Sequence, residues 1–140
     1  MATLIEKLRL KNCRQIVVLD APESLAPELA RLPVLHLHHH LASAQRPEFI
    51  LAFVTRKAQV DALAPRIAAH IPGDVPIWFA YPKGTSKNYT CDFNRDTGWD
   101  ALRGVGFETV RAIAIDEDWT ALRFRRREYI KARSKTGQSR

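Results

Sequence analysis

The stretch FILAFVTRKAQVDALAPRIAAHIPGDVPIWFAY, residues 49–81, decides the fold. Its two ends, residues 49–54 and 76–81, are apolar on both faces, which is typical of central strands in a parallel sheet. The segment between them predicts a helix, because one apolar stripe recurs at spacings of three and four: Val60, Leu63, Ile67 and Ile71. A strand, a helix and a second strand in this order indicate parallel pairing with a right-handed crossover.

The preceding residues extend the same alternation. Residues 2–11 predict a short amphipathic helix, and the branched run at residues 15–20 predicts a buried strand. A short helix over residues 24–32 follows, with capping-box spacing before it. Residues 34–40 alternate between apolar and polar side chains, which favours a half-exposed strand at the sheet edge.

The following residues complete the predicted domain. Thr55 can cap the central helix and Pro65 should kink it. A helix is expected from Asp96 or Thr97 to about Arg103, and the alternating runs 109–115 and 119–127 predict an antiparallel hairpin. The predicted fold class is α/β, an open, mostly parallel Rossmann-like sheet with helices on both faces and a C-terminal antiparallel hairpin.

Length and composition indicate the number of domains and the cellular location of the protein. A chain of 140 residues predicts a single α/β domain over residues 1–130, followed by a basic, disordered tail over residues 131–140. No apolar run approaches the ~20 residues of a membrane span, and the first residues lack a signal-peptide core, so we expect a cytoplasmic protein without membrane contact. Cys13 and Cys91 are too far apart in sequence to indicate a disulfide framework.

The net charge of +7 is concentrated near the C-terminus. Eight basic residues and one acid follow residue 122, and removing them from totals of 22 and 15 leaves 14 of each in residues 1–122. A neutral body with a basic end favours a solvated extension. Nucleic acid is therefore an improbable partner, and any contact through the C-terminal segment should be weak and salt-sensitive.

Two short motifs carry a family resemblance. They are Ile77-Trp78 with Tyr81-Pro82-Lys83, an I-W-x-x-Y-P-K segment, and the later pair Asp118-Trp119. The chain resembles over residues 12–130 a small bacterial family of unknown function, which implies no activity. Its second half also resembles the carboxy-terminal half of the class I S-adenosylmethionine-dependent methyltransferase fold.

The turn after the first strand argues against a cofactor. Methyltransferases of that class have a glycine-rich turn there, whereas residues 20–24 read DAPES. The G-x-G-x-x-G dinucleotide fingerprint is absent for the same reason. We therefore predict no cofactor.

Ligand-binding candidates follow the strands. Ligands of open parallel sheets bind beyond the carboxyl ends of the strands. Asp20 follows the first strand, and Thr55, Arg56 and Lys57 follow the central one. The segment after residue 82 offers ammonium, hydroxyl and backbone N–H donors to an anion through Lys83, Gly84, Thr85, Ser86 and Lys87.

Other reactive side chains have ordinary structural explanations. His36, His38 and His40 share one face of the predicted strand and could bind zinc, but no nearby cysteine or carboxylate completes a site. We predict no metal and assign no catalytic residue. Cys91 is adjacent to Asp92, whose charge should raise the thiol pKa.

These observations lead to three ranked interpretations of function. The leading one is a non-enzymatic small-molecule or anion-binding, or regulatory, protein with its site at the carboxyl ends of the strands. The first alternative is an enzyme acting at the same rim on a phosphate- or carboxylate-bearing substrate held by Lys83 and Lys87. The second alternative is weak nucleic-acid binding through the basic C-terminal segment.

Overall fold

The computed structural model describes residues 15–25, 27, 36–38, 47–71, 73–93 and 97–130. The predicted helix over residues 2–11, most of the helix predicted over residues 24–32, and the tail over residues 131–140 lie outside these ranges.

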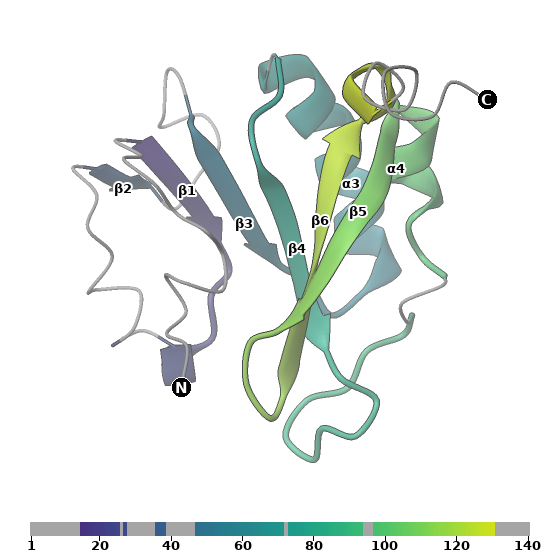
Figure 1. The fold of residues 1–140 in the computed structure, drawn as a ribbon. Coiled ribbons are helices and arrows are strands. Elements are labelled where there is room, and N and C mark those ends of the chain that lie inside the picture. The colour runs from purple at the N-terminus through teal and green to yellow at the C-terminus, as the bar shows by residue number, and fades with distance from the viewer. Residues whose placement is uncertain are drawn as a thin grey trace.

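The described strands form one six-stranded sheet in the order β2-β1-β3-β4-β6-β5 (Figure 1). Their bounds are β1 Gln15–Leu19, β2 His36–His38, β3 Phe49–Phe53, β4 Ile77–Pro82, β5 Phe107–Ala114 and β6 Trp119–Arg126. The first four strands pair in parallel, and β2 lies at the predicted edge. Strand β6 pairs antiparallel with both β4 and β5, which confirms the C-terminal hairpin and places its second strand inside the sheet.

The described helices differ in detail from the sequence predictions. Helix α3 (Lys57–His70) runs through Pro65 as one helix. It begins two residues after Thr55, and the Gln59 side chain accepts the backbone N–H groups of Thr55 and Arg56. The predicted start at Asp96 or Thr97 is wrong, because helix α4 is confined to Asp100–Gly104.

Buried side chains form one cluster on each face of the sheet. On the first face, α3 and α4 both cover the sheet, and Ile67 and Leu102 pack with Ile50 and Phe124. On the second face, Leu25 of the 3-10 helix η1 (Glu23–Leu25) joins Trp78 and Trp119. The open, mostly parallel α/β fold is confirmed.

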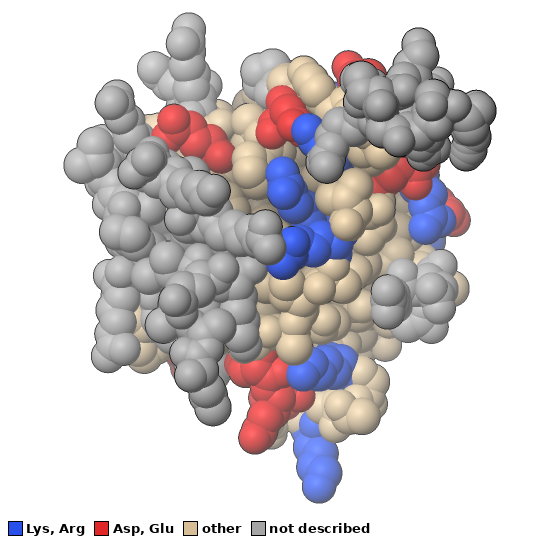
Figure 2. Space-filling model, viewed as in Figure 1, with Lys and Arg blue, Asp and Glu red and all other residues tan. Residues whose placement is uncertain are grey.

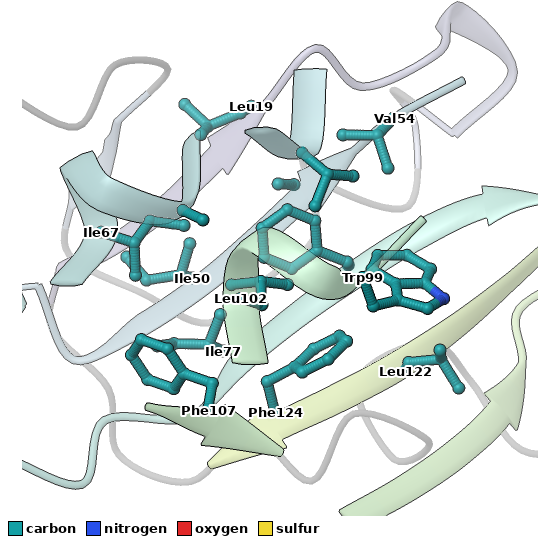
Figure 3. Close-up of a cluster of buried hydrophobic side chains, with 14 of the residues drawn as sticks. Leu19, Ile50, Val54, Ile67, Ile77, Trp99, Leu102, Phe107, Leu122 and Phe124 are labelled. Carbon is teal, nitrogen blue, oxygen red and sulfur yellow. The ribbon is translucent and has the colours of Figure 1, made fainter. Parts of the chain in front are cut away.

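Trp99 belongs to the first cluster and is fully buried (Figure 3). Its ring packs within 4.9–6.0 Å, centre to centre, of four aromatic rings, those of Phe79, Tyr81, Phe93 and Phe124. Because Phe93 belongs to the segment between β4 and α4, this contact ties that segment to the core.

Among the described residues, no helix combines the length and apolar character that crossing a membrane requires.

Candidate functional site

The carboxyl ends of β1, β3 and β4 lie at one rim of the sheet, because these strands are parallel. The turn between β5 and β6 lies at the same rim, since β6 starts beside the end of β4, with Trp119 opposite Pro82 (Figure 1). Acidic and basic side chains lie near one another at this lower end of the molecule (Figure 2). The rim therefore brings the candidate ligand-binding segments together with an acidic turn that sequence reasoning had left out of the site.

The turn after β1 bends sharply at Asp20. This residue has φ of +53°, in the left-handed region that glycine favours and that aspartate tolerates better than most residues. Its side chain is exposed and has no hydrogen-bond partner among the described residues. The backbone thus makes, without glycine, a bend of the kind for which a glycine is usually required.

The N-terminus of α3 already has an anionic partner. The Asp92 carboxylate accepts the backbone N–H of Lys57 at 2.7 Å. The Lys57 ammonium lies 3.0 Å from Asp61, and this bond raises the pKa of Lys57. Thr55 and Lys57 lie at the rim as predicted, but these internal partners compete with any external anion.

The loop after β4 is fastened to the β5–β6 turn by Asp118. The Asp118 carboxylate accepts the Ser86 hydroxyl at 2.8 Å and the Asn88 amide at 3.2 Å, and its carbonyl accepts the Lys83 N–H at 2.8 Å. Ser86 Oγ in turn accepts the backbone N–H of Tyr89 at 3.1 Å. The polar loop after β4 is therefore an ordered element, and the Ser86 hydroxyl proton is directed to Asp118.

Two cavities flank this loop. The larger, of about 500 Å³, lies beyond the end of β4 and is lined by ten residues: Tyr81, Pro82, Lys83, Gly84, Ser86, Tyr89, Thr90, Cys91, Phe93 and Thr120. The smaller, of about 380 Å³, lies beyond β3 and is lined by Thr55, Arg56, Asn88, Tyr89, Thr90 and Asp92. Tyr89 and Thr90 line both cavities and therefore form the wall between them.

The structure places the predicted candidates unevenly around these cavities. Lys83, Gly84 and Ser86 line the larger one and Thr55 lines the smaller. Asp20, Lys57, Thr85 and Lys87 line neither. Neither of these two cavities is lined by both Asp20 and Lys83.

Sequence reasoning missed Tyr89, Thr90 and Asp118 as contributors to the site. In the sequence analysis Asp118 had a place only in the Asp118-Trp119 motif of the family resemblance. The signal for its role was its place in the D-W motif, because Trp119 pairs with Pro82 of the Y-P-K motif across β4 and β6.

Cys91 is half-buried in the wall of the larger cavity. Burial raises the pKa of its thiol, and the Asp92 charge raises it further. The direction predicted from sequence is confirmed, although burial is the larger cause. A thiol with a raised pKa is mostly protonated at neutral pH and is a weak nucleophile.

The one histidine of strand β2 whose side chain is described, His38, has a hydrogen-bond partner within the fold. His38 Nε2 lies 2.7 Å from Gln15 Oε1, within hydrogen-bond distance. The side chains of His36 and His40 lie outside the described residues. Among the side chains that are described, no group of three metal-ligating residues is close enough to hold an ion.

Each arginine of the triplet at residues 125–127 has a partner within the fold. Arg125 forms a bidentate ion pair with Asp74, with a shortest distance of 2.6 Å. Arg126 donates to the carbonyl oxygens of Ala68 and Gly73 and stacks 5.0 Å from the ring centre of Phe107. Arg127 donates to Glu108 and to a carbonyl of α4. Phosphate binding by this triplet would compete with these contacts, and the expectation that nucleic acid is an unlikely partner stays a prediction.

Replacing Asp118 with alanine should lower the free energy of unfolding by about 1–3 kcal/mol, because it leaves Ser86 and Asn88 without their charged acceptor. Urea denaturation measures the loss, and limited proteolysis should show faster cleavage within residues 83–90. The control is Glu117→Ala, an exposed neighbour, with an expected change within about 0.5 kcal/mol. Equal stability and equal cleavage in the two variants would contradict the anchoring role of Asp118.

Comparison with known proteins identifies the fold through solved structures. No family model and no curated protein matches the chain. Fibrillarin, a pre-rRNA processing protein of Methanococcus jannaschii, aligns over 83% of this chain and 67% of its own, with 10% identity and a TM-score of 0.53. The N-methyltransferase NodS of Bradyrhizobium japonicum aligns over 88% and 92%, with 15% identity and a TM-score of 0.54. A ribosomal protein L11 methylase of Lactobacillus delbrueckii subsp. bulgaricus aligns over 88% and 74%, with 14% identity and a TM-score of 0.53.

The chain therefore has the fold of the class I S-adenosylmethionine-dependent methyltransferases. This result corrects the leading interpretation of function. The non-enzymatic binding or regulatory protein is contradicted, because proteins with this fold include a named methyltransferase and a named methylase. The enzyme alternative fits better. The absence of a glycine motif after β1 does not exclude this fold, because Asp20 forms the bend with φ of +53°.

Proposed function

We propose that this protein is an enzyme that transfers a methyl group to a small acceptor at the carboxyl-end rim of its sheet. The observation that carries the proposal is the fold shared with NodS over 88% of this chain and 92% of that one. The two cavities at the rim support it, because ligands of open parallel sheets bind beyond the carboxyl ends of the strands.

S-adenosylmethionine is the proposed methyl donor. NodS has also been solved with S-adenosyl-L-homocysteine and the structural neighbour LepI with SAM. The donor supplies a methyl group activated by a positively charged sulfonium. The strand order changes direction between β1 and β3, which is where such folds bind their ligands. Asp20 lies at this point, and its exposed carboxylate can pair with the amino group or accept the ribose hydroxyls of the donor.

The turn after β1 suits this ligand in two respects, because its backbone bends sharply at Asp20 and it carries the Asp20 charge. It departs from a glycine-rich turn in one respect. Pro22 has no backbone N–H, and side chains replace the hydrogens of glycine at residues 20–24. The backbone is therefore less approachable and offers fewer donors, so we expect the Asp20 side chain to contribute a large share of the affinity. Thr55, which follows β3, lines the smaller cavity, and Tyr89 and Thr90 line both cavities.

Isothermal titration with S-adenosylmethionine and S-adenosyl-L-homocysteine tests the proposal. Asp20→Asn, which keeps the tolerance for positive φ and removes the charge, should weaken binding at least about tenfold. Glu117→Gln, which removes an exposed acid of the β5–β6 turn, should leave the affinity unchanged. Failure of the unaltered protein to bind either compound at millimolar concentration would overturn the proposal.

The resemblance to a small bacterial family of unknown function is a further part of this proposal. Its two motifs meet at the rim, because Trp119 lies opposite Pro82 and the Asp118 carbonyl accepts the Lys83 N–H. Residues with this placement support a shared site rather than a shared core alone. We propose that members of that family use the same loop and turn for the same class of reaction.

A further inference from the structure

We propose that the larger cavity, beyond the end of β4, binds a small aromatic carboxylic acid whose carboxylate pairs with Lys83. The inference rests on the proposed function only in identifying this acid as the methyl acceptor. A ring hydroxyl or amino group of the acid would then form the new bond to the methyl carbon and lose its proton to water, while the methyl–sulfur bond of S-adenosylmethionine would break and S-adenosyl-L-homocysteine would leave. The cavity volume of about 500 Å³ lies within the ~300–1,000 Å³ range of small-molecule sites, and it suits a ligand of one or two rings.

Aromatic side chains form the walls of this cavity. Tyr81 and Phe93 come from the end of β4 and from the far end of the loop, and their ring centres are 5.8 Å apart. Tyr89 forms another part of the lining, and its own ring is fixed 4.9 Å from that of Trp119. Walls of this kind favour a flat apolar ligand, because aromatic rings attract one another edge to face or in offset stacks.

Lys83 supplies the cavity with a positive charge. Its backbone is fixed by the hydrogen bond to the Asp118 carbonyl, and its residue is half-buried at the cavity wall. No ion pair or hydrogen bond of its ammonium is formed with any described residue. A positive charge beside an apolar wall attracts an anion.

The remaining donors favour a carboxylate over a phosphate. The Ser86 hydroxyl donates to Asp118, and the Thr120 hydroxyl donates to the Ile113 carbonyl, so both protons are already used. The backbone N–H of Ser86 donates to the backbone carbonyl oxygen of Lys83 and is also used. Among the described residues that line the cavity, Lys83 is the one cation, and the Thr90 and Tyr89 hydroxyls and the Cys91 thiol remain as further donors. One positive charge suits the single charge of a carboxylate. A phosphate has three strong acceptor oxygens and about two charges, and the nearby Asp118 carboxylate would repel it.

The experiment uses the full chain and benzoate as the probe. Benzamide serves as the neutral analogue of benzoate. Phenyl phosphate and inorganic phosphate test whether the cavity prefers a phosphate. Two-dimensional NMR titration gives the dissociation constant of each and the residues that respond. We expect benzoate to shift the signals of residues 83–93 and Thr120, and to bind at least about tenfold more tightly than benzamide.

Matched lysine variants test the assignment to Lys83. Lys83→Gln should weaken benzoate binding at least about tenfold, whereas Lys87→Gln, in the same loop but outside the cavity lining, should leave it unchanged. Unchanged thermal unfolding temperatures would show that both variants are folded. Equal binding of benzoate and benzamide, tighter binding of either phosphate, equal effects of the two variants, or no benzoate binding at millimolar concentration would each overturn the inference.

The two proposals fail separately. Benzoate binding without any S-adenosylmethionine binding would support the carboxylate site and refute methyl transfer. Binding of S-adenosylmethionine without benzoate binding would support the proposed function and refute the aromatic carboxylate as its acceptor.

Discussion

Replacing Trp99 with alanine should lower the free energy of unfolding by about 3–5 kcal/mol. Trp99 is fully buried, and four aromatic rings surround it (Figure 3). The truncation leaves a cavity that the sheet on one side and α4 on the other cannot both close. The free energy of unfolding of a domain of this size is only about 5–15 kcal/mol, so the variant loses a large part of its stability. The shift of the urea denaturation midpoint measures it.

The control for this variant is Val105→Ala, at a side chain that is 36% exposed just after α4. We expect a change within about 0.5 kcal/mol there, as for most surface substitutions. A Trp99→Ala variant that unfolds at the same urea concentration as the control would contradict the buried packing of this ring.

Replacing Gly98 with alanine should be nearly as damaging, with an expected loss of about 2–5 kcal/mol from backbone strain and overpacking together. Gly98 has φ of +90°, and a Cβ there would lie 2.6 Å from the Cβ and 2.7 Å from the Cγ of Phe93. The neighbouring atoms belong to the stem of a buried side chain and cannot move aside freely. Urea denaturation again measures the loss in the free energy of unfolding.

Gly104→Ala is the matched control for this glycine. A Cβ at Gly104 meets no atom within 4 Å, its φ is not positive, and it lies in the last turn of α4. Alanine should be neutral there or stabilise the protein by up to about 1 kcal/mol. A Gly98→Ala variant as stable as Gly104→Ala would refute the close packing between Gly98 and Phe93.

Continuous apolar runs made the central strands predictable. Residues 49–53 and 77–82 are buried on both faces, which is typical of central strands in a parallel sheet. The insertion of β6 between β4 and β5 was not predictable from periodicity, because alternation shows that a strand is half-buried and does not show which strands it pairs with. Helix α4 was expected too early, since Asp96 and Thr97 have the composition of a cap and local propensity does not report the packing of Trp99.

The site was predictable only at the level of strand ends. Topology alone places Asp20, Thr55 and Lys83 at one rim, and the structure agrees. The contribution of Asp118 depends on a hydrogen bond to Ser86 across 32 positions of sequence, which no local pattern encodes. The same holds for Asp92, which reaches the N-terminus of α3 from 35 positions away.

The position of β6 also governs when the site can form during synthesis. Strands β1 to β4 leave the ribosome first and can pair with one another, but one edge of β4 stays open until residues 119–126 have emerged. Until then the loop after β4 also lacks Asp118. A nascent chain therefore possesses most of its sheet before the rim at the carboxyl ends of its strands is complete. A ribosome that stalls before residue 118 would release a product with an exposed strand and a loop that lacks its partner Asp118.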